Sequence, residues 1–233
     1  MKRPVKIIVE GVADVRFVQD YISFLFGEDL KEKTDILSAG GWTRLDSDSA
    51  FVQQLNQNRD NGGVNLIIFD ADADCQARRK EILDWKEANN LDFELFLFPN
   101  DNDPGVLETL LERIINPNNA PIFDCWDKYE KCLGTKEIEG RKVPLTRPAI
   151  KTKIYGYLEA LLGESLKQKE LIKERERNYK NPDHWNLNAE AIAPLKEFLL
   201  ANLRESFYKI NVSCAIFCFQ SVWYGNTPSQ IGC

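Results

Sequence analysis

The sequence predicts an α/β fold, in which a doubly wound, mostly parallel sheet is flanked by helices and followed by a helical C-terminal extension. Short runs rich in β-branched and aromatic residues alternate with segments of helical periodicity as far as residue 115. The run VNLIIF (64–69) is apolar at nearly every position, as expected of a strand that is covered on both faces. After Asn116 the alternation stops and helical patterns dominate.

The elements can be assigned in chain order from their apolar spacing. Strands are predicted at Val5–Val9, Asp35–Ser38, Val64–Phe69 and Phe93–Phe98. A first helix is predicted from Val15, Val18, Ile22 and Phe26, and others at Phe51–Asn58, Cys75–Asn89, Val106–Ile115, Ile150–Leu162, 164–180 and Ala191–Leu203. A small hairpin is expected around Glu139-Gly140, and the tail from Tyr208 is left unassigned. We therefore expect an α/β domain over residues 1–116, with the mainly helical part 117–233 packed on it as one unit.

The composition favours a core-forming protein without a membrane segment. Of the 233 residues 43% are hydrophobic, yet no apolar run approaches the roughly 20 residues of a membrane span. The first apolar run breaks at Glu10, so it predicts a strand and not a signal peptide. Six scattered cysteines without an export signal indicate reduced thiols and a cytoplasmic location. A single histidine argues against a histidine-based zinc site or a His-dependent triad.

The charge is unevenly distributed along the chain. The formal net charge is −6, but residues 141–180 carry eleven Lys and Arg against five Glu. An acidic remainder beside this basic segment fits a metal-dependent enzyme that acts on a polyanion, with Lys151, Lys153, Arg175 and Arg177 as candidate phosphate contacts. The same pattern also fits an ordinary charged surface helix.

Carboxylates follow two of the predicted strands at the point where each strand ends. Glu10 ends the first strand, and Asp70, Asp72 and Asp74 follow the third. In an open α/β sheet the carboxyl ends of the strands form the edge at which ligands bind. Carboxylate oxygens suit a hard cation such as Mg²⁺, so these acids are candidate metal ligands. The alternative is a solvated acidic turn in which Asp74 caps the following helix.

The combination of motifs resembles the Toprim domain of topoisomerases, primases, small maturation nucleases and overcoming-lysogenization-defect nucleases. The Toprim pattern is a glutamate at the end of the first strand, here IIVEGVAD, and a D-x-D at the end of a later one, here IIFDADAD. The run FLFPNDNDPGVLETLLERI and the later DHWNLNAEAIAPLKEFL are similar to the stand-alone, Toprim-like DUF3226 type. This resemblance covers roughly residues 5 to 203 and implies a Toprim-like fold for residues 1–116.

The resemblance also implies roles for individual acids. Glu10 matches the acid–base glutamate, and Asp70 and Asp72 match the metal-binding pair, with Asp74 holding a second metal or a water. Asp14 and Glu108 match recurrent acids of the subfamily; equally, each can serve as a helix N-terminal acid that interacts with backbone N–H groups. The chain departs from larger relatives because it has no P-loop motif, and none of its seven tyrosines lies in the setting of a topoisomerase nucleophile.

Three functions remain open at this level. The first is a phosphoryl-transfer protein that requires Mg²⁺ or Mn²⁺, most simply a nuclease acting on DNA or RNA. The second is a non-catalytic Toprim-fold binding or accessory module that works with a separate partner protein. The third is an enzyme that acts on a small phosphate compound through an acidic Mg²⁺ site. The sequence does not specify the oligomeric state.

Overall fold

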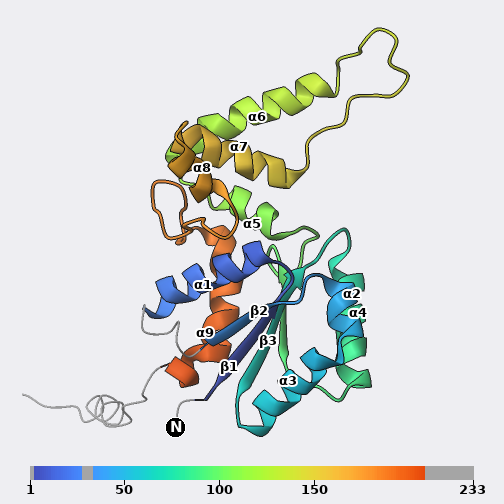
Figure 1. Ribbon diagram of the computed structural model, residues 1–233, viewed down its shortest axis with the longest axis vertical. Helices are drawn as coiled ribbons and strands as arrows, with labels where there is room; N and C mark the ends of the chain where they lie inside the picture. Colours follow the sequence, from blue (N-terminus) through green and yellow to red (C-terminus); the bar gives the residue numbers. More distant parts are fainter. Residues whose placement is uncertain (1–2, 28–33, 208–233) are drawn as a thin grey trace, which may run out of the picture.

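A four-stranded, wholly parallel sheet forms the centre of the molecule in a computed structural model, which describes residues 3–27 and 34–207 (Figure 1). Its strands are β1 (Val5–Val9), β2 (Thr34–Ser38), β3 (Val64–Asp70) and β4 (Glu94–Phe98). They lie in the order β2-β1-β3-β4, so β1 and β3 are neighbours. The predicted α/β class is confirmed.

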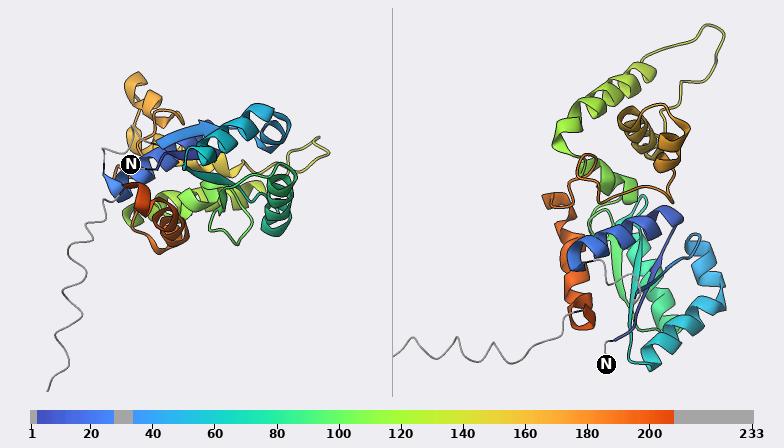
Figure 2. Two further views of the ribbon diagram at one scale, coloured as in Figure 1. Left: turned by 90° about the horizontal axis from the view of Figure 1, so that it is seen from below. Right: turned by 60° about the vertical axis from the view of Figure 1, so that its left-hand side comes forward.

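Helices cover both faces of the sheet, as Figure 2 shows from two further directions. One face carries α1 (Val12–Phe26), α5 (Leu107–Arg113) and α9 (Ala193–Phe207). The other carries α2 (Trp42–Ser47), α3 (Ser49–Asp60) and α4 (Cys75–Ala88). Successive side chains of a strand point to opposite faces, so Ile7 and Val9 of β1 join the first layer and Ile8 the second. This double burial explains the continuous apolar runs of the strands.

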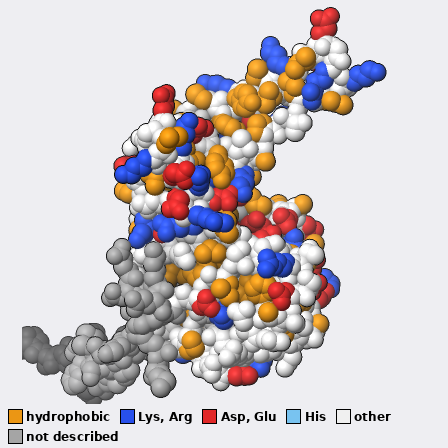
Figure 3. All heavy atoms as spheres, viewed as in Figure 1, with side chains coloured by type: hydrophobic (Ala, Val, Ile, Leu, Met, Phe, Trp, Pro, Cys, Tyr) orange, Lys and Arg blue, Asp and Glu red, His pale blue; other side chains and the backbone are white. Residues whose placement is uncertain are grey.

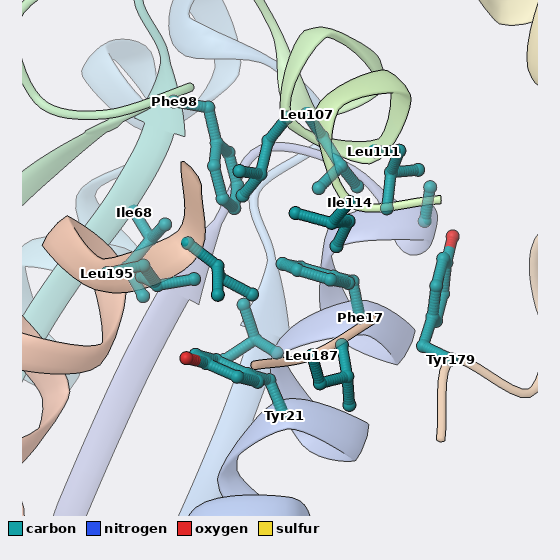
Figure 4. Close-up of a cluster of buried hydrophobic side chains, with 14 of the residues drawn as sticks. Phe17, Tyr21, Ile68, Phe98, Leu107, Leu111, Ile114, Tyr179, Leu187 and Leu195 are labelled. Atoms are coloured by element: carbon teal, nitrogen blue, oxygen red, sulfur yellow. The ribbon is translucent and has the colours of Figure 1, made fainter. Parts of the chain in front are cut away.

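The core on the α1 face joins segments that are far apart in the sequence (Figure 4). The ring of Phe17 lies 6.0 Å from that of Phe98 at the end of β4 and 5.2 Å from that of Tyr179. Helix α9 completes this layer: the ring of Phe198 lies 5.4 Å from that of Phe96. Helix α9, the last described element, therefore packs on the same sheet as β1, the first strand of the chain.

A helical arm, residues 117–188, is inserted between α5 and α9 and extends beyond the carboxyl ends of the strands (Figure 1). It contains η2 (Pro117–Asn119), α6 (Ala120–Leu133), α7 (Ile150–Leu162) and α8 (Leu166–Ile172), and the short η3 (Glu190–Ile192) follows it. Lys153 of α7 ties the arm to α5, because its ammonium group contacts Glu112 and lies 2.7 Å from Asp127 of α6. The arm is thus attached next to the strand ends.

Several details differ from the sequence-based expectation. Residues 134–149 form an irregular loop at the end of the arm, so the expected hairpin around Glu139-Gly140 is wrong. The helix expected over 164–180 ends at Ile172, because the charged run that follows offers no apolar side chain to bury until the chain turns inward. Helices α2 and α6 were not predicted. The unassigned tail from Tyr208 lies outside the described residues.

The helices can also be compared with what a membrane span requires. Within residues 3–27 and 34–207, every helix is too short or too polar to cross a membrane.

Candidate carboxylate site

Glu10 and Asp70 meet at the carboxyl edge of the sheet, because β1 and β3 are hydrogen-bonded neighbours. The backbone N–H of Asp70 donates to Oε2 of Glu10 across a distance of 3.4 Å. The backbone carbonyl of Glu10 accepts the N–H groups of Gly40 (2.9 Å) and Gly41 (3.2 Å), so the loop after β2 holds this residue from the other side. Two strand ends therefore place half-buried carboxylates at the same edge of the sheet.

Two buried acids lie behind this pair at the starts of helices. Asp14, in the first turn of α1, is 6% exposed, and Glu108, in the first turn of α5, is 9% exposed. Oδ2 of Asp14 accepts the backbone N–H of Gly11 at 2.6 Å, and Oδ1 of Asp70 accepts the N–H of Leu107 at 2.9 Å. Each contact satisfies an N–H group that a helix start leaves without a partner.

The acids are close enough to shift one another's ionisation. Burial raises the pKa of Asp70 to about 8, and the charges of Asp14, Glu10 and Glu108 add to the shift, while the N–H of Leu107 opposes it. Burial also raises the pKa of Asp14 to about 7, with further contributions from Glu108 and Glu10. The pKa of Glu10 is raised as well, chiefly by burial. Glu10, Asp14, Asp70 and Glu108 are called the carboxylate site below.

Asp72 and Asp74 lie at the exposed rim and have other partners. A guanidinium nitrogen of Arg78 contacts Oδ2 of Asp72. Oδ1 of Asp74 accepts the backbone N–H groups of Gln76 and Ala77, both at 3.0 Å, and so caps α4. The capping role is the alternative that the sequence left open for Asp74.

The loop after β4 is fastened to this rim. The backbones of Asp72 and Gly105 exchange two hydrogen bonds, of 2.9 and 2.7 Å. Gly105 has a φ of +144°, and a Cβ there would lie 2.8 Å from Oγ1 of Thr109, so only glycine suits the position. The PNDNDPG run thus connects the D-x-D segment to the start of α5, which carries Glu108.

Sequence reasoning missed the basic residue of the site. Arg78, in the first turn of α4, connects Asp72 to Glu81, and its guanidinium carbon lies 6.0 Å from the centre of the Trp42 ring. Trp42 follows the two glycines that hold Glu10, and its ring contacts that of Trp85. The sequence did hold a signal for Arg78. A basic residue one turn into a helix can reach back to acidic residues that lie just before that helix.

The four predicted phosphate contacts lie in the arm, in different environments. Lys151 pairs with Glu174, and Lys153 is buried between Glu112 and Asp127. Arg177 is almost fully buried, whereas Arg175 is exposed. Only Lys151 and Arg175 are therefore accessible to a phosphate group without rearrangement of the arm.

The donor set fits a hard divalent cation in its chemistry, because it consists of carboxylates whose mutual repulsion a cation would relieve. Figure 3 shows acidic side chains gathered on the sheet-containing lobe where its surface faces the hollow beneath the arm. In the part of the chain that the structure describes, no three His, Cys, Asp or Glu side chains stand in an arrangement that could hold a metal ion. Asp72 and Asp74 in particular are engaged by Arg78 and by α4.

The chain was compared with protein families, curated proteins and solved structures. A family model described as a protein of unknown function, DUF3226, matches residues 4–203. The chain belongs to the DUF3226 family. The match runs from β1 into α9 and so includes the carboxylate site and the whole helical arm. No curated protein and no solved structure matches the chain.

Proposed function

We propose that this DUF3226 protein is a Mg²⁺-dependent phosphoryl-transfer protein, most simply a nuclease that acts on DNA or RNA through a Toprim-type carboxylate site. The observation that carries the proposal is the contact between Asp70 and Glu10, which joins the ends of two neighbouring parallel strands. The order of motifs, a glutamate after the first strand and D-x-D after a later one, resembles the Toprim pattern.

In this proposal different residues of the site bind the metal and transfer the proton. Asp70, with Asp72 once its ion pair with Arg78 opens, would hold Mg²⁺ or Mn²⁺. When bound, such an ion neutralises charge on a phosphate and lowers the pKa of a bound water. Glu10 has a raised pKa, so its carboxyl group can hold a proton nearer to neutral pH and return it to a leaving oxygen. Asp14 and Glu108 add negative charge behind the pair.

The helical arm supports the choice of a polyanionic substrate. It lies beyond the strand ends, and Lys151 and Arg175 are accessible on it. The charge of Glu108 acts on Lys151, so this lysine lies near the acids. A phosphate chain that passes beneath the arm would meet the carboxylate site on one side and basic side chains on the other.

A cleavage assay and a metal titration together test the proposal. Single- and double-stranded DNA and RNA are incubated with the protein and Mg²⁺ or Mn²⁺, and Mn²⁺ binding is measured by calorimetry. We expect Asp70→Asn to abolish both cleavage and binding. Asp84→Asn, which alters an exposed acid of α4 paired with Lys80, is the matched control and should retain both. Cleavage that survives Asp70→Asn would overturn the assignment.

A non-catalytic accessory module is the second candidate. It is favoured by the engagement of Asp72 and Asp74 with Arg78 and α4, which leaves no ready group of three ligands among the described residues. Such a protein would bind neither Mn²⁺ nor Mg²⁺ in calorimetry at millimolar metal and would cleave none of the substrates. That result would favour a role carried out with a separate partner protein.

A further inference from the structure

A small cavity lies within the helical arm, away from the carboxylate site. Its volume is about 140 Å³, and it is lined by side chains of α7, α8 and the segment that follows α8. Its lining combines three leucines, Leu158, Leu162 and Leu171, with five residues whose side chains bear nitrogen, namely Arg177, Asn178, Asn181, His184 and Trp185. A cavity with this mixed lining is typical of sites for small ligands.

Arg177 is a buried cation that forms no ion pair with any described carboxylate. Its side chain is 1% exposed, its Nε donates to the carbonyl of Ile172 at 2.8 Å, and its guanidinium carbon lies 4.4 Å from the centre of the Tyr155 ring. Nη1 is 3.5 Å from the hydroxyl of Tyr179, and Nη2 has no hydrogen-bond partner among the described residues. An arginine cannot lose its charge in a protein, so burial without a counter-ion is costly.

The second unsatisfied group at this cavity is also a donor. Nε1 of Trp185 is buried, and within residues 3–27 and 34–207 it has no hydrogen-bond partner. An indole N–H and a guanidinium can only donate, so the group that complements them must accept hydrogen bonds. Burial lowers the pKa of His184, which keeps its imidazole neutral at pH 7 and leaves Arg177 as the source of positive charge. A ligand that complements both groups would therefore be an anion with acceptor oxygens.

We propose that this cavity binds a small carboxylate that bears an apolar body. The Nη1–Nη2 edge of Arg177 matches a carboxylate in a two-pronged arrangement, and the leucines would contact the apolar body. An apolar cavity of about 150 Å³ holds a benzene molecule, so the space suits a body of that size. The site is independent of the function proposed above. The competing explanation is that Arg177 serves only to cap the C-terminal end of α8 through Ile172.

Benzoate is the probe, and the indole N–H resonance of Trp185, identified with Trp185→Phe, reports on the site. We expect millimolar benzoate to shift this resonance saturably and to raise the melting temperature. Leu171→Trp should weaken binding at least tenfold, because Leu171 is 43% exposed and a larger side chain there fills the cavity from its outer side. Leu166→Trp is the matched control on the same helix: Leu166 is 85% exposed and does not line the cavity.

Arg177→Met removes the charge and should abolish binding, but it can also unfold the arm; Leu171→Trp keeps the test decisive in that case. No shift of the Trp185 resonance in the wild-type protein would overturn the proposal, as would full binding by Leu171→Trp. Inorganic phosphate serves as a second probe. Equal binding of phosphate, which has no apolar body, would overturn the assignment of a carboxylate with an apolar part.

Discussion

Arg78 and Asp72 form an ion pair at the rim of the carboxylate site. The guanidinium also donates to Oε2 of Glu81 at 2.8 Å, and Trp42 lies 6.0 Å away, so Arg78 is held in place from three directions. Burial raises the pKa of Glu10, and the charge of Arg78 opposes that rise. Arg78 therefore acts on both Asp72 and Glu10.

Replacement of Arg78 by glutamine should tighten metal binding. If Asp72 must leave Arg78 to hold a metal, the ion pair competes with the metal, and its removal relieves that competition. A partly exposed ion pair is worth up to about 1 kcal/mol, so the affinity for Mn²⁺ should rise about fivefold. Calorimetric titration of the variant with Mn²⁺ measures this directly.

Arg79→Gln provides the matched control, because Arg79 is the next residue of α4 and pairs with Asp101, away from Asp72. It should leave the affinity for Mn²⁺ unchanged. Unchanged or weaker metal binding by Arg78→Gln, beside wild-type protein that binds Mn²⁺, would show that the ion pair does not compete with the metal.

The metal-free protein should lose stability as the pH rises from 5 to 8. The pKa values of Asp14 and Asp70 are raised from 3.8 to about 7 and about 8, so the folded protein keeps protons that the unfolded chain releases near pH 4. Folding in this window takes up protons, and a higher pH therefore opposes it. For the two groups together the loss is on the order of 6 kcal/mol. Urea unfolding at a series of pH values, in the presence of a chelator, measures it.

Asp70→Asn is the companion variant for this pH series. An amide does not ionise, so the stability of the variant should change less between pH 5 and 8. An excess of Mg²⁺ at pH 8 should restore stability to the wild-type protein and not to Asp70→Asn. A wild-type stability that rises with pH over this window would contradict the raised pKa values.

The sequence was sufficient to predict the sheet, because three of its four strands, β1, β3 and β4, are largely buried and have clear apolar runs. The meeting of Glu10 and Asp70 also follows from sequence, since two acids at the ends of parallel strands share an edge. The position of strand ends says nothing of Arg78, because its contact with Asp72 depends on the path of the turn, in which Asp72 has a φ of +53°.

The helical arm was the harder part to predict. Charge counting treated Arg177 and Lys153 as surface residues, whereas both are buried: Lys153 contacts Glu112 and Asp127, and Arg177 packs against the ring of Tyr155. Nothing in the local pattern of 164–180 distinguishes a basic residue that faces the solvent from one that turns inward. Contacts with Tyr155 and Asp127 decide the orientation, and these are tertiary.

Substitution of Asp74 should separate its capping role from a role in metal binding. Asp74→Ala removes the acceptor for the N–H groups of Gln76 and Ala77 and should lower the free energy of unfolding by about 1 kcal/mol. Asp74→Asn keeps a capping oxygen and should restore most of that stability. If capping is the main role of Asp74, Asp74→Asn will also bind Mn²⁺ as tightly as wild type. A clear loss of Mn²⁺ affinity in this stable variant would instead assign Asp74 to the metal.

Lys153→Met should loosen the attachment of the arm to α5. The lysine is buried, and its ammonium group contacts both Glu112 and Asp127 and lies 4.9 Å from the centre of the Phe123 ring. Its loss leaves two carboxylates without a partner, but both are partly exposed, so we expect a loss of about 2 kcal/mol rather than the larger value for a fully buried pair. Urea unfolding measures the change.

Lys151→Met is the matched control, on the same helix, because Lys151 is half exposed in its ion pair with Glu174 and should contribute at most about 1 kcal/mol. In a nucleic-acid binding assay, by contrast, Lys151→Met should have the larger effect of the two variants. Lys151→Met should weaken binding and reduce its salt dependence, since Lys151 is accessible to phosphate. Lys153→Met should leave the salt dependence unchanged while the arm is folded. Equal effects of both variants on stability would contradict the difference in burial, and a reduced salt dependence in Lys153→Met would place that lysine in contact with phosphate.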